Sequence, residues 1–193
     1  MLKKVWAWVV LGFVLAVSMG QAASDVISPQ NPLPRFELST PQDQGGLAYL
    51  GVDAKKSKFT VGDIDADVVI IEIFSMYCPF CQLEAPKVNT LFKRIAEDKA
   101  LAGRVKLIGI GVGNSDYEVD YFRKSYQIDF PLFSDGDFTI HKAFGEVRTP
   151  FFVGIKRGAD GQPIVFFTHL GAFESVEGFL ADIIKASGIK GGK

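Results

Sequence analysis

The chain has 193 residues, of which 48% are hydrophobic and 12% aromatic, and its formal net charge is -1. This composition can fill one well-packed core and excludes a disordered or collagen-like protein. No run of Lys or Arg occurs along the sequence. A nucleic-acid partner is therefore not expected, because its electrostatic footprint is missing.

The N-terminus has the pattern of a secretory signal. Lys3 and Lys4 precede an apolar run over residues 5–17, and the following SMGQAAS offers cleavage after Ala22 or, as second choice, Ala23. An uncleaved anchor is the alternative, although the run is shorter than the roughly 20 residues that span a bilayer comfortably. A lipid-anchored start would require a cysteine directly after the run, and none is present there. We expect a periplasmic or otherwise exported protein, in a compartment where disulfides persist.

Three parts of the chain are expected. Residues 1–23 form the signal, and residues 24–35 are predicted to be a linker because SPQNPLPR is rich in Pro and polar residues. One folded domain then covers residues 36–193, beginning near Phe36.

Strand and helix patterns alternate along this domain. VVIIEIF, residues 68–74, is a nearly continuous β-branched run, which predicts a strand buried on both faces of a sheet. A helix follows, with Val88, Leu91, Phe92 and Ile95 at helical spacing. Next come a predicted strand over 105–112, a helix around 117–126 and a short extended segment over 130–135.

The C-terminal part predicts a hairpin and a last helix. FFVGIK and PIVFFTHL flank the turn RGADGQ, and the helix carries an apolar stripe made of Val176, Phe179, Leu180, Ile183 and Ile184. The whole pattern predicts an α/β or α+β domain with a central mixed sheet flanked by helices.

The only two cysteines of the chain, Cys78 and Cys81, follow the predicted strand at 68–74. Cys78 occupies the expected N-cap, and Pro79 the first helical position, where its missing N–H costs nothing. The amides of Phe80 and Cys81 should then point at the Cys78 sulfur, and the helix dipole should favour its thiolate. Cys81, one turn on, can form a disulfide with Cys78 but is less accessible. We expect Cys78 to attack and Cys81 to resolve.

Other uses of these thiols fit less well. A zinc site needs four ligands, and His141 and His169 lack the compact spacing of a structural site. A purely structural disulfide across so small a loop would remove little entropy from the unfolded chain. GIGVGN, residues 109–114, lacks the GxGxxG spacing of a nucleotide site. A redox-active pair without metal or cofactor is the favoured interpretation.

The stretch VVIIEIFSMYCPFCQLEAP resembles the active-site strand and helix of the thioredoxin superfamily. Its CxxCxxExP run, Cys78, Cys81, Glu84 and Pro86, is similar to the TlpA/ResA-type thiol-disulfide oxidoreductases that bacteria export. The resemblance implies a thioredoxin-like fold with an inserted strand and helix, 105–112 and 117–126, before a cis-proline loop. The match over residues 126–156 makes Pro150 the cis-proline and Thr149 the residue before it. HLGAF is like the last strand and Gly-Ala turn of thioredoxin.

The resemblance also suggests roles for two acids. Glu84 would approach Cys81 and relay a proton to or from its sulfur; the alternative is a solvated acid near the helix start. Glu72 matches the position of the buried acid of thioredoxin and would be a proton relay for Cys81. Its alternative is a carboxylate at the sheet edge, paired with a Lys or Arg.

Substrate contacts are expected from the backbone of Thr149 beside Pro150, with apolar surface from Tyr77, Phe80 and Phe173. The sequence departs from its relatives, because Tyr77 replaces their usual Trp and the middle dipeptide is Pro-Phe. The side chain of Phe80 cannot donate a hydrogen bond to the thiolate, as the His side chain of DsbA-like oxidants does. A reductant or mid-potential exchanger is therefore favoured.

The sequence thus predicts an exported enzyme, a protein thiol-disulfide oxidoreductase. The resemblance implies that its partners are exported proteins with disulfides or thiols, apocytochrome c being one candidate, and a membrane electron donor if it is a reductase. The alternatives are a DsbA-like oxidant and a non-catalytic peptide- or copper-binding module of the same fold. A copper carrier would have CxxxC and a nearby His. A peroxidase would have a PxxxTxxC-like run, in which Ile71 replaces the proline.

Overall fold

The protein is represented by a computed structural model that describes residues 26–189. The predicted signal over residues 1–23 lies outside this range. Among the described residues, every helix is too short or too polar to cross a membrane.

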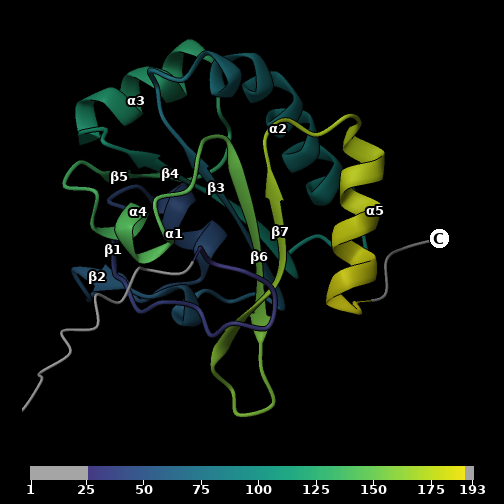
Figure 1. The fold of residues 1–193 in the computed structure, drawn as a ribbon. Helices are drawn as coiled ribbons and strands as arrows, with labels where there is room; N and C mark the ends of the chain where they lie inside the picture. Colours follow the sequence, from purple (N-terminus) through teal and green to yellow (C-terminus); the bar gives the residue numbers. More distant parts are fainter. Residues whose placement is uncertain (1–25, 190–193) are drawn as a thin grey trace, which may run out of the picture.

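The domain is organised around a five-stranded mixed sheet of order β5-β4-β3-β6-β7 (Figure 1). The strands are β3 (Val68–Phe74), β4 (Val105–Val112), β5 (Leu132–Asp135), β6 (Phe151–Arg157) and β7 (Pro163–Leu170). β3 pairs in parallel with β4 and antiparallel with β6. Every residue of β3 is buried, which explains the continuous apolar run and confirms the strand predicted at 68–74.

Helices cover both faces of the sheet (Figure 1). On one face, α2 (Pro79–Glu97), α3 (Asp116–Ser125) and α5 (Val176–Ser187) pack against Val68, Ile70 and Phe74 of β3. On the other face, α1 (Gln44–Leu50) and α4 (Thr139–Ala143) cover Val69, Ile71 and Ile73. This alternation follows from the two-residue period of a strand, and it assigns even-numbered residues of β3 to the α2 face.

Three short elements and a helix, α1, precede β3 in the described chain. β1 (Leu38–Ser39) pairs antiparallel with β2 (Lys58–Phe59) outside the main sheet, and a 3-10 turn, η1, follows at Val61–Asp63. Asp43 is the N-cap of α1, and its carboxylate accepts a hydrogen bond from the Gly46 N–H at 2.7 Å. Its two glycines are poor helix formers, so the cap and tertiary packing decide its structure rather than propensity.

The folded unit begins earlier than the predicted boundary at Phe36. Ile27 is buried and donates its N–H to the Phe144 carbonyl at 3.1 Å, while the Gln30 N–H donates to Val165 of β7 at 2.9 Å. The described part of the predicted linker, residues 24–35, is therefore hydrogen-bonded to the domain at several points, although most of its side chains are exposed. The physical reason is that β7 is an edge strand, and its free backbone groups pair with this Pro-rich segment.

Candidate active site

The thiol motif lies where the central strand gives way to α2. β3 ends at Phe74, Cys78 is the N-cap of α2, and Pro79 is its first residue, as predicted. The Cys78 N–H donates to the Ser75 carbonyl at 3.0 Å, which closes a tight turn before the helix. The helix then continues through Pro86, which lacks the N–H for one helical hydrogen bond.

Two side chains that sequence reasoning missed hold this turn in place. The buried Asn114, just after β4, accepts the Met76 N–H on its Oδ1 at 2.8 Å. From the other side, the Gln82 amide donates to the Met76 carbonyl at 2.7 Å. In the sequence, Asn114 could have been noticed as a polar residue at the end of a predicted buried strand. Its partner Met76 could not have been predicted, because it is far away in the chain.

The electrostatic surroundings of Cys78 favour its thiolate. Partial burial raises the pKa of the Cys78 thiol, but hydrogen bonding from the Thr149 side chain opposes this. The sulfur makes no side-chain capping hydrogen bond within the distance and angle of an ordinary one. The Cys81 and Phe80 N–H groups at the helix start nevertheless lower its pKa, as does the Cys81 side chain, and the net pKa lies below the ordinary value.

Cys81 has the opposite environment. It is a fully buried residue of α2, and burial raises its thiol pKa well above the ordinary value, despite a hydrogen bond with the Ser75 backbone. The Cys78 side chain and the nearby charge of Glu72 contribute to the same increase. The two thiols therefore differ both in access and in acidity, which is the inequality that the helix geometry predicts.

The loop before β6 faces the first thiol. The Thr149–Pro150 peptide bond is cis, as predicted. The Cys78 Sγ lies 3.4 Å from the Thr149 carbonyl oxygen, to which the protonated thiol donates. The Pro150 carbonyl in turn accepts the Gly171 N–H at 2.8 Å, which ties this loop to the turn after β7. Segments far apart in the sequence thus meet at Cys78.

Glu72 is buried beneath α2 and not at the sheet edge. It lies on the even-numbered face of β3 with Ile70 and Phe74, is 3% exposed, and its Oε1 has no hydrogen-bond partner. Burial, with a smaller contribution from the charge of Glu84, raises its carboxyl pKa from 4.5 to about 8. Among the described residues no Lys or Arg pairs with it, so the ion-pair alternative has no support.

Glu84 is neither solvated nor free to approach Cys81. It is 2% exposed, and its Oε1 accepts the Phe173 N–H at 3.0 Å. Its Oε2 lies 3.3 Å from the Lys87 ammonium, which also donates to the Phe173 carbonyl at 2.9 Å. Both backbone groups of Phe173 are therefore held by α2. The sequence did not indicate these contacts, because the loop that contains Phe173 is far from Glu84 and Lys87 in the chain.

Replacing Glu84 with alanine should destabilise the domain by about 2 kcal/mol, because the buried Phe173 N–H then loses its acceptor. Glu84→Gln keeps a side-chain oxygen and should cost less than half as much. Urea unfolding at about pH 5 measures both, since Glu72 is then protonated in the folded state and its repulsion with Glu84 vanishes. Equal losses for the two variants would contradict this anchoring role.

The predicted substrate-contact residues separate into two groups. Tyr77 and Phe80 are exposed beside the thiol, at 65% and 67% of their full surface. Phe173 is instead buried, with its ring stacked on Phe179 at 4.3 Å between centroids. The prediction that Phe173 offers surface to a substrate is wrong, because the residue belongs to the core between the sheet and α5.

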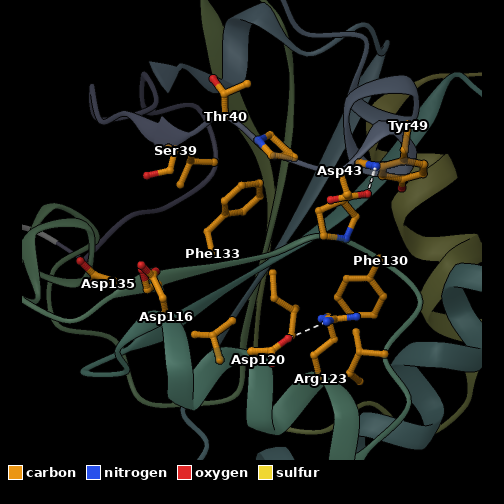
Figure 2. Close-up of a pocket in the computed structure, with 18 of the residues that line it drawn as sticks. Ser39, Thr40, Asp43, Tyr49, Asp116, Asp120, Arg123, Phe130, Phe133 and Asp135 are labelled. Carbon is orange, nitrogen blue, oxygen red and sulfur yellow. Dashed lines mark hydrogen bonds and ion pairs between the residues drawn. The ribbon is translucent and has the colours of Figure 1, made fainter. Parts of the chain in front are cut away.

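A large hollow in the described part of the chain lies away from the cysteines (Figure 2). Its volume is about 1050 Å³, and its walls come from β1, α1, α3 and β5. Asp120 on its floor pairs with Arg123, and Asp135 accepts the Ile140 and His141 N–H groups. No thiol lines this hollow, and the carboxylates named here already have protein partners.

The two histidines take part in local structure. His141 in α4 has its Nε2 2.8 Å from the Val147 carbonyl, and His169 is in β7. Within residues 26–189, no three His, Cys, Asp or Glu side chains gather as a metal site would require.

The sequence of residues 29–168, more than half of the chain, matches the AhpC/TSA family. The chain belongs to the AhpC/TSA family. This AhpC/TSA-family chain is 24% identical over 102 residues to the thiol-disulfide oxidoreductase ResA of Bacillus thuringiensis, an alignment that covers 53% of this chain and 56% of that protein. It thus spans about half the length of the curated relatives it matches.

Solved structures confirm the thioredoxin-like fold of this AhpC/TSA-family protein. A secreted Mycobacterium tuberculosis disulfide oxidoreductase homologous to E. coli DsbE superposes with a TM-score of 0.54 and 18% identity, covering 78% of this chain and 95% of that one. StoA from Bacillus subtilis has a TM-score of 0.53 and 18% identity, over 77% of this chain and 96% of its own. At such identities the likeness concerns the fold alone.

Proposed function

We propose that this protein is an exported thiol-disulfide oxidoreductase that reduces or exchanges disulfides in other exported proteins. The observation that carries the proposal is the unequal thiol pair: Cys78 is half-buried with a lowered pKa, and Cys81 is fully buried with a raised one. A nucleophile that is accessible and a resolving thiol that is protected are what thiol-disulfide exchange requires.

In the first step the Cys78 thiolate attacks one sulfur of the target disulfide. A bond forms between the two sulfurs, and the other target sulfur leaves as a thiolate that takes a proton. The Thr149 carbonyl, 3.4 Å from the Cys78 sulfur, borders the path of an extended target segment. Backbone pairing with that segment would align the target disulfide with Cys78.

In the second step Cys81 loses its proton and attacks the Cys78 sulfur. The second target sulfur leaves as a thiol, and the enzyme retains a Cys78–Cys81 disulfide, so two electrons and two protons pass to the target. Glu72 is the proposed acceptor of the Cys81 proton, because its charge already acts on that thiol. An external reductant, here a proposed membrane electron donor, restores the dithiol.

Export is part of the proposal and rests on the N-terminal sequence, with Lys3 and Lys4 before an apolar run and small residues near Ala22. Exported proteins that carry disulfides are the proposed substrates, and apocytochrome c is one candidate among them. Cleavage of the signal can be checked by N-terminal sequencing of the protein recovered from the periplasm.

The reduction potential of the Cys78–Cys81 couple tests the direction of the reaction. We expect a value closer to the about -270 mV of thioredoxin than to the about -120 mV of DsbA, because the side chain of Phe80 adds no donor for the thiolate. Equilibration in glutathione or dithiothreitol buffers gives the potential, and reduction of insulin disulfides gives turnover. A potential near that of DsbA would indicate an oxidant. An intact dithiol without any turnover would favour a non-catalytic binding module.

A further inference from the structure

Exposed apolar side chains are concentrated around the first thiol. Tyr77, Phe80 and Leu83 lie on the active-site turn and the start of α2, and Tyr117 and Tyr121 lie on the neighbouring α3. These five make up most of the large hydrophobic side chains that are exposed in the described residues. Single exposed apolar residues are ordinary on a protein surface, whereas such a group marks an interaction site.

A hollow of about 410 Å³ lies between the active-site turn and α3. We call it the tyrosine pocket; it is lined by Met76, Tyr77, Ser115, Tyr117, Glu118 and Tyr121. Tyr117 and Tyr121 are one helical turn apart, so their rings lie on the same side of α3. They are 78% and 55% exposed, and neither makes a side-chain hydrogen bond within the described residues.

Glu118 is the only charged residue of the tyrosine pocket. Its carboxylate accepts hydrogen bonds from the Tyr77 hydroxyl and, at 2.7 Å, from the Ser115 N–H. Hydrogen bonds from Tyr77 and Ser115 hold the pKa of Glu118 below its usual range, so it is ionised at neutral pH. Among the described residues Glu118 has no cationic partner, whereas the basic residues Arg123 and Lys124 of the same helix are paired with Asp120.

We propose that the tyrosine pocket binds an arginine or lysine side chain of the substrate protein, next to the disulfide that Cys78 attacks. Aromatic faces attract a cation, and a carboxylate fixed at their edge adds a charge-assisted hydrogen bond. Among residues 26–189, no Lys or Arg lines the pocket to compete for this place.

The position of the pocket explains why the basic residue should lie close to the target cysteine. Tyr77 directly precedes Cys78, and the Tyr77–Glu118 hydrogen bond joins the active-site turn to α3. A substrate segment held at Thr149 therefore passes Cys78 with one flank near the pocket. This inference rests on the proposed function and refines it, because it defines a substrate class: exported proteins with a basic residue flanking the disulfide.

The test uses three disulfide-bonded peptides that are identical except for one residue beside the attacked cysteine: arginine, norleucine or glutamate. The reduced full-length protein should show a kcat/KM about 10-fold higher for the arginine peptide than for the norleucine peptide, and lowest for the glutamate peptide. Glu118→Gln should reduce the arginine preference to about 2-fold, since glutamine keeps the capping arrangement with Ser115 but loses the charge. Tyr117→Ala should reduce it as well.

Asp120→Asn is the matched control. It removes one carboxylate from the same helix but lies outside the tyrosine pocket, at the large hollow. This variant should retain most of the arginine preference. The comparison distinguishes an effect of binding in the tyrosine pocket from an effect of the net charge of α3. Urea unfolding of each variant confirms that α3 remains folded.

Several results would overturn the inference. An equal rate for the three peptides, a preference for norleucine, or an arginine preference that Glu118→Gln leaves intact would each exclude a cation site. Equal losses in Glu118→Gln and Asp120→Asn would assign the preference to long-range charge. Exchange with uncharged hydroxyethyl disulfide tests the thiol chemistry by itself. If this small disulfide reacts but the peptides show no arginine preference, only the inference about the pocket fails. If no disulfide reacts, the proposed function fails with it.

Discussion

Replacing Cys78 with serine is expected to abolish disulfide exchange, whereas replacing Cys81 with serine should preserve the first step and block the second. Cys78 carries the lowered pKa and the access to a target, and Cys81 is buried with a raised pKa. Without Cys81 the mixed disulfide between Cys78 and the target cannot resolve. The Cys81→Ser protein should therefore accumulate covalent complexes with exported proteins, visible on non-reducing gels and released by dithiothreitol.

The double variant Cys78→Ser/Cys81→Ser is the control and should trap nothing. Alkylation of the reduced protein near neutral pH gives an independent reading of the two thiols, because only the thiolate reacts. Iodoacetamide should modify Cys78 at least about 100-fold faster than Cys81, given their separated pKa values and access. Faster labelling of Cys81, or stable complexes formed by Cys78→Ser, would reverse the roles of the two residues.

Replacing Glu72 with glutamine should stabilise the domain increasingly as the pH rises. Burial raises the Glu72 pKa from 4.5 to about 8. Between these values the folded protein retains a proton that the unfolded chain has lost, so stability falls with rising pH and levels off above about pH 8. The full shift corresponds to roughly 3 to 5 kcal/mol at about 1.4 kcal/mol per pKa unit. Glutamine cannot ionise and removes this cost.

Urea unfolding at about pH 5 and about pH 8.5 measures the effect as a difference between Glu72→Gln and its parent. Both proteins should carry Cys78→Ser and Cys81→Ser, so that thiol titration does not contribute. Glu97→Gln serves as control, because Glu97 is exposed at the end of α2 and forms one ion pair within residues 26–189, with Arg94 at 4.0 Å. A Glu72→Gln effect that is the same at both pH values would mean that Glu72 is not a buried acid with a raised pKa.

The same substitution should slow the resolving step in the protein with both cysteines. If Glu72 accepts the Cys81 proton, the rate of resolution should rise with pH through about pH 8, where Glu72 ionises. Glu72→Gln should lower the rate and flatten this profile, which stopped-flow measurement of release from a mixed disulfide can follow. An unchanged rate and profile would limit Glu72 to an effect on stability.

The regular elements of the domain were predictable because local patterns encode them. The apolar run at 68–74 is the central strand, the strand predicted at 105–112 is β4, and the stripe at Val176 to Ile184 lies on α5. The Cys78 N-cap and Pro79 at the first helical position also follow from local rules. The start of the domain was misplaced, because the pairing of residues 30–33 with β7 is a tertiary contact that composition does not reveal.

In the candidate active site, too, local features could be predicted from the sequence and long-range contacts could not. The sequence by itself determined that two thiols stand at the start of a helix after a buried strand, and from this the inequality of Cys78 and Cys81 follows. Only the tertiary structure decided what surrounds them. It buried Glu72 beneath α2, engaged Glu84 with Phe173 and Lys87, and joined Tyr77 to Glu118. The physical reason is that these contacts join residues far apart in the chain, whereas periodicity and capping describe only neighbouring residues. Long-range packing sets both the burial that shifts a pKa and the partners that are available to a charged side chain.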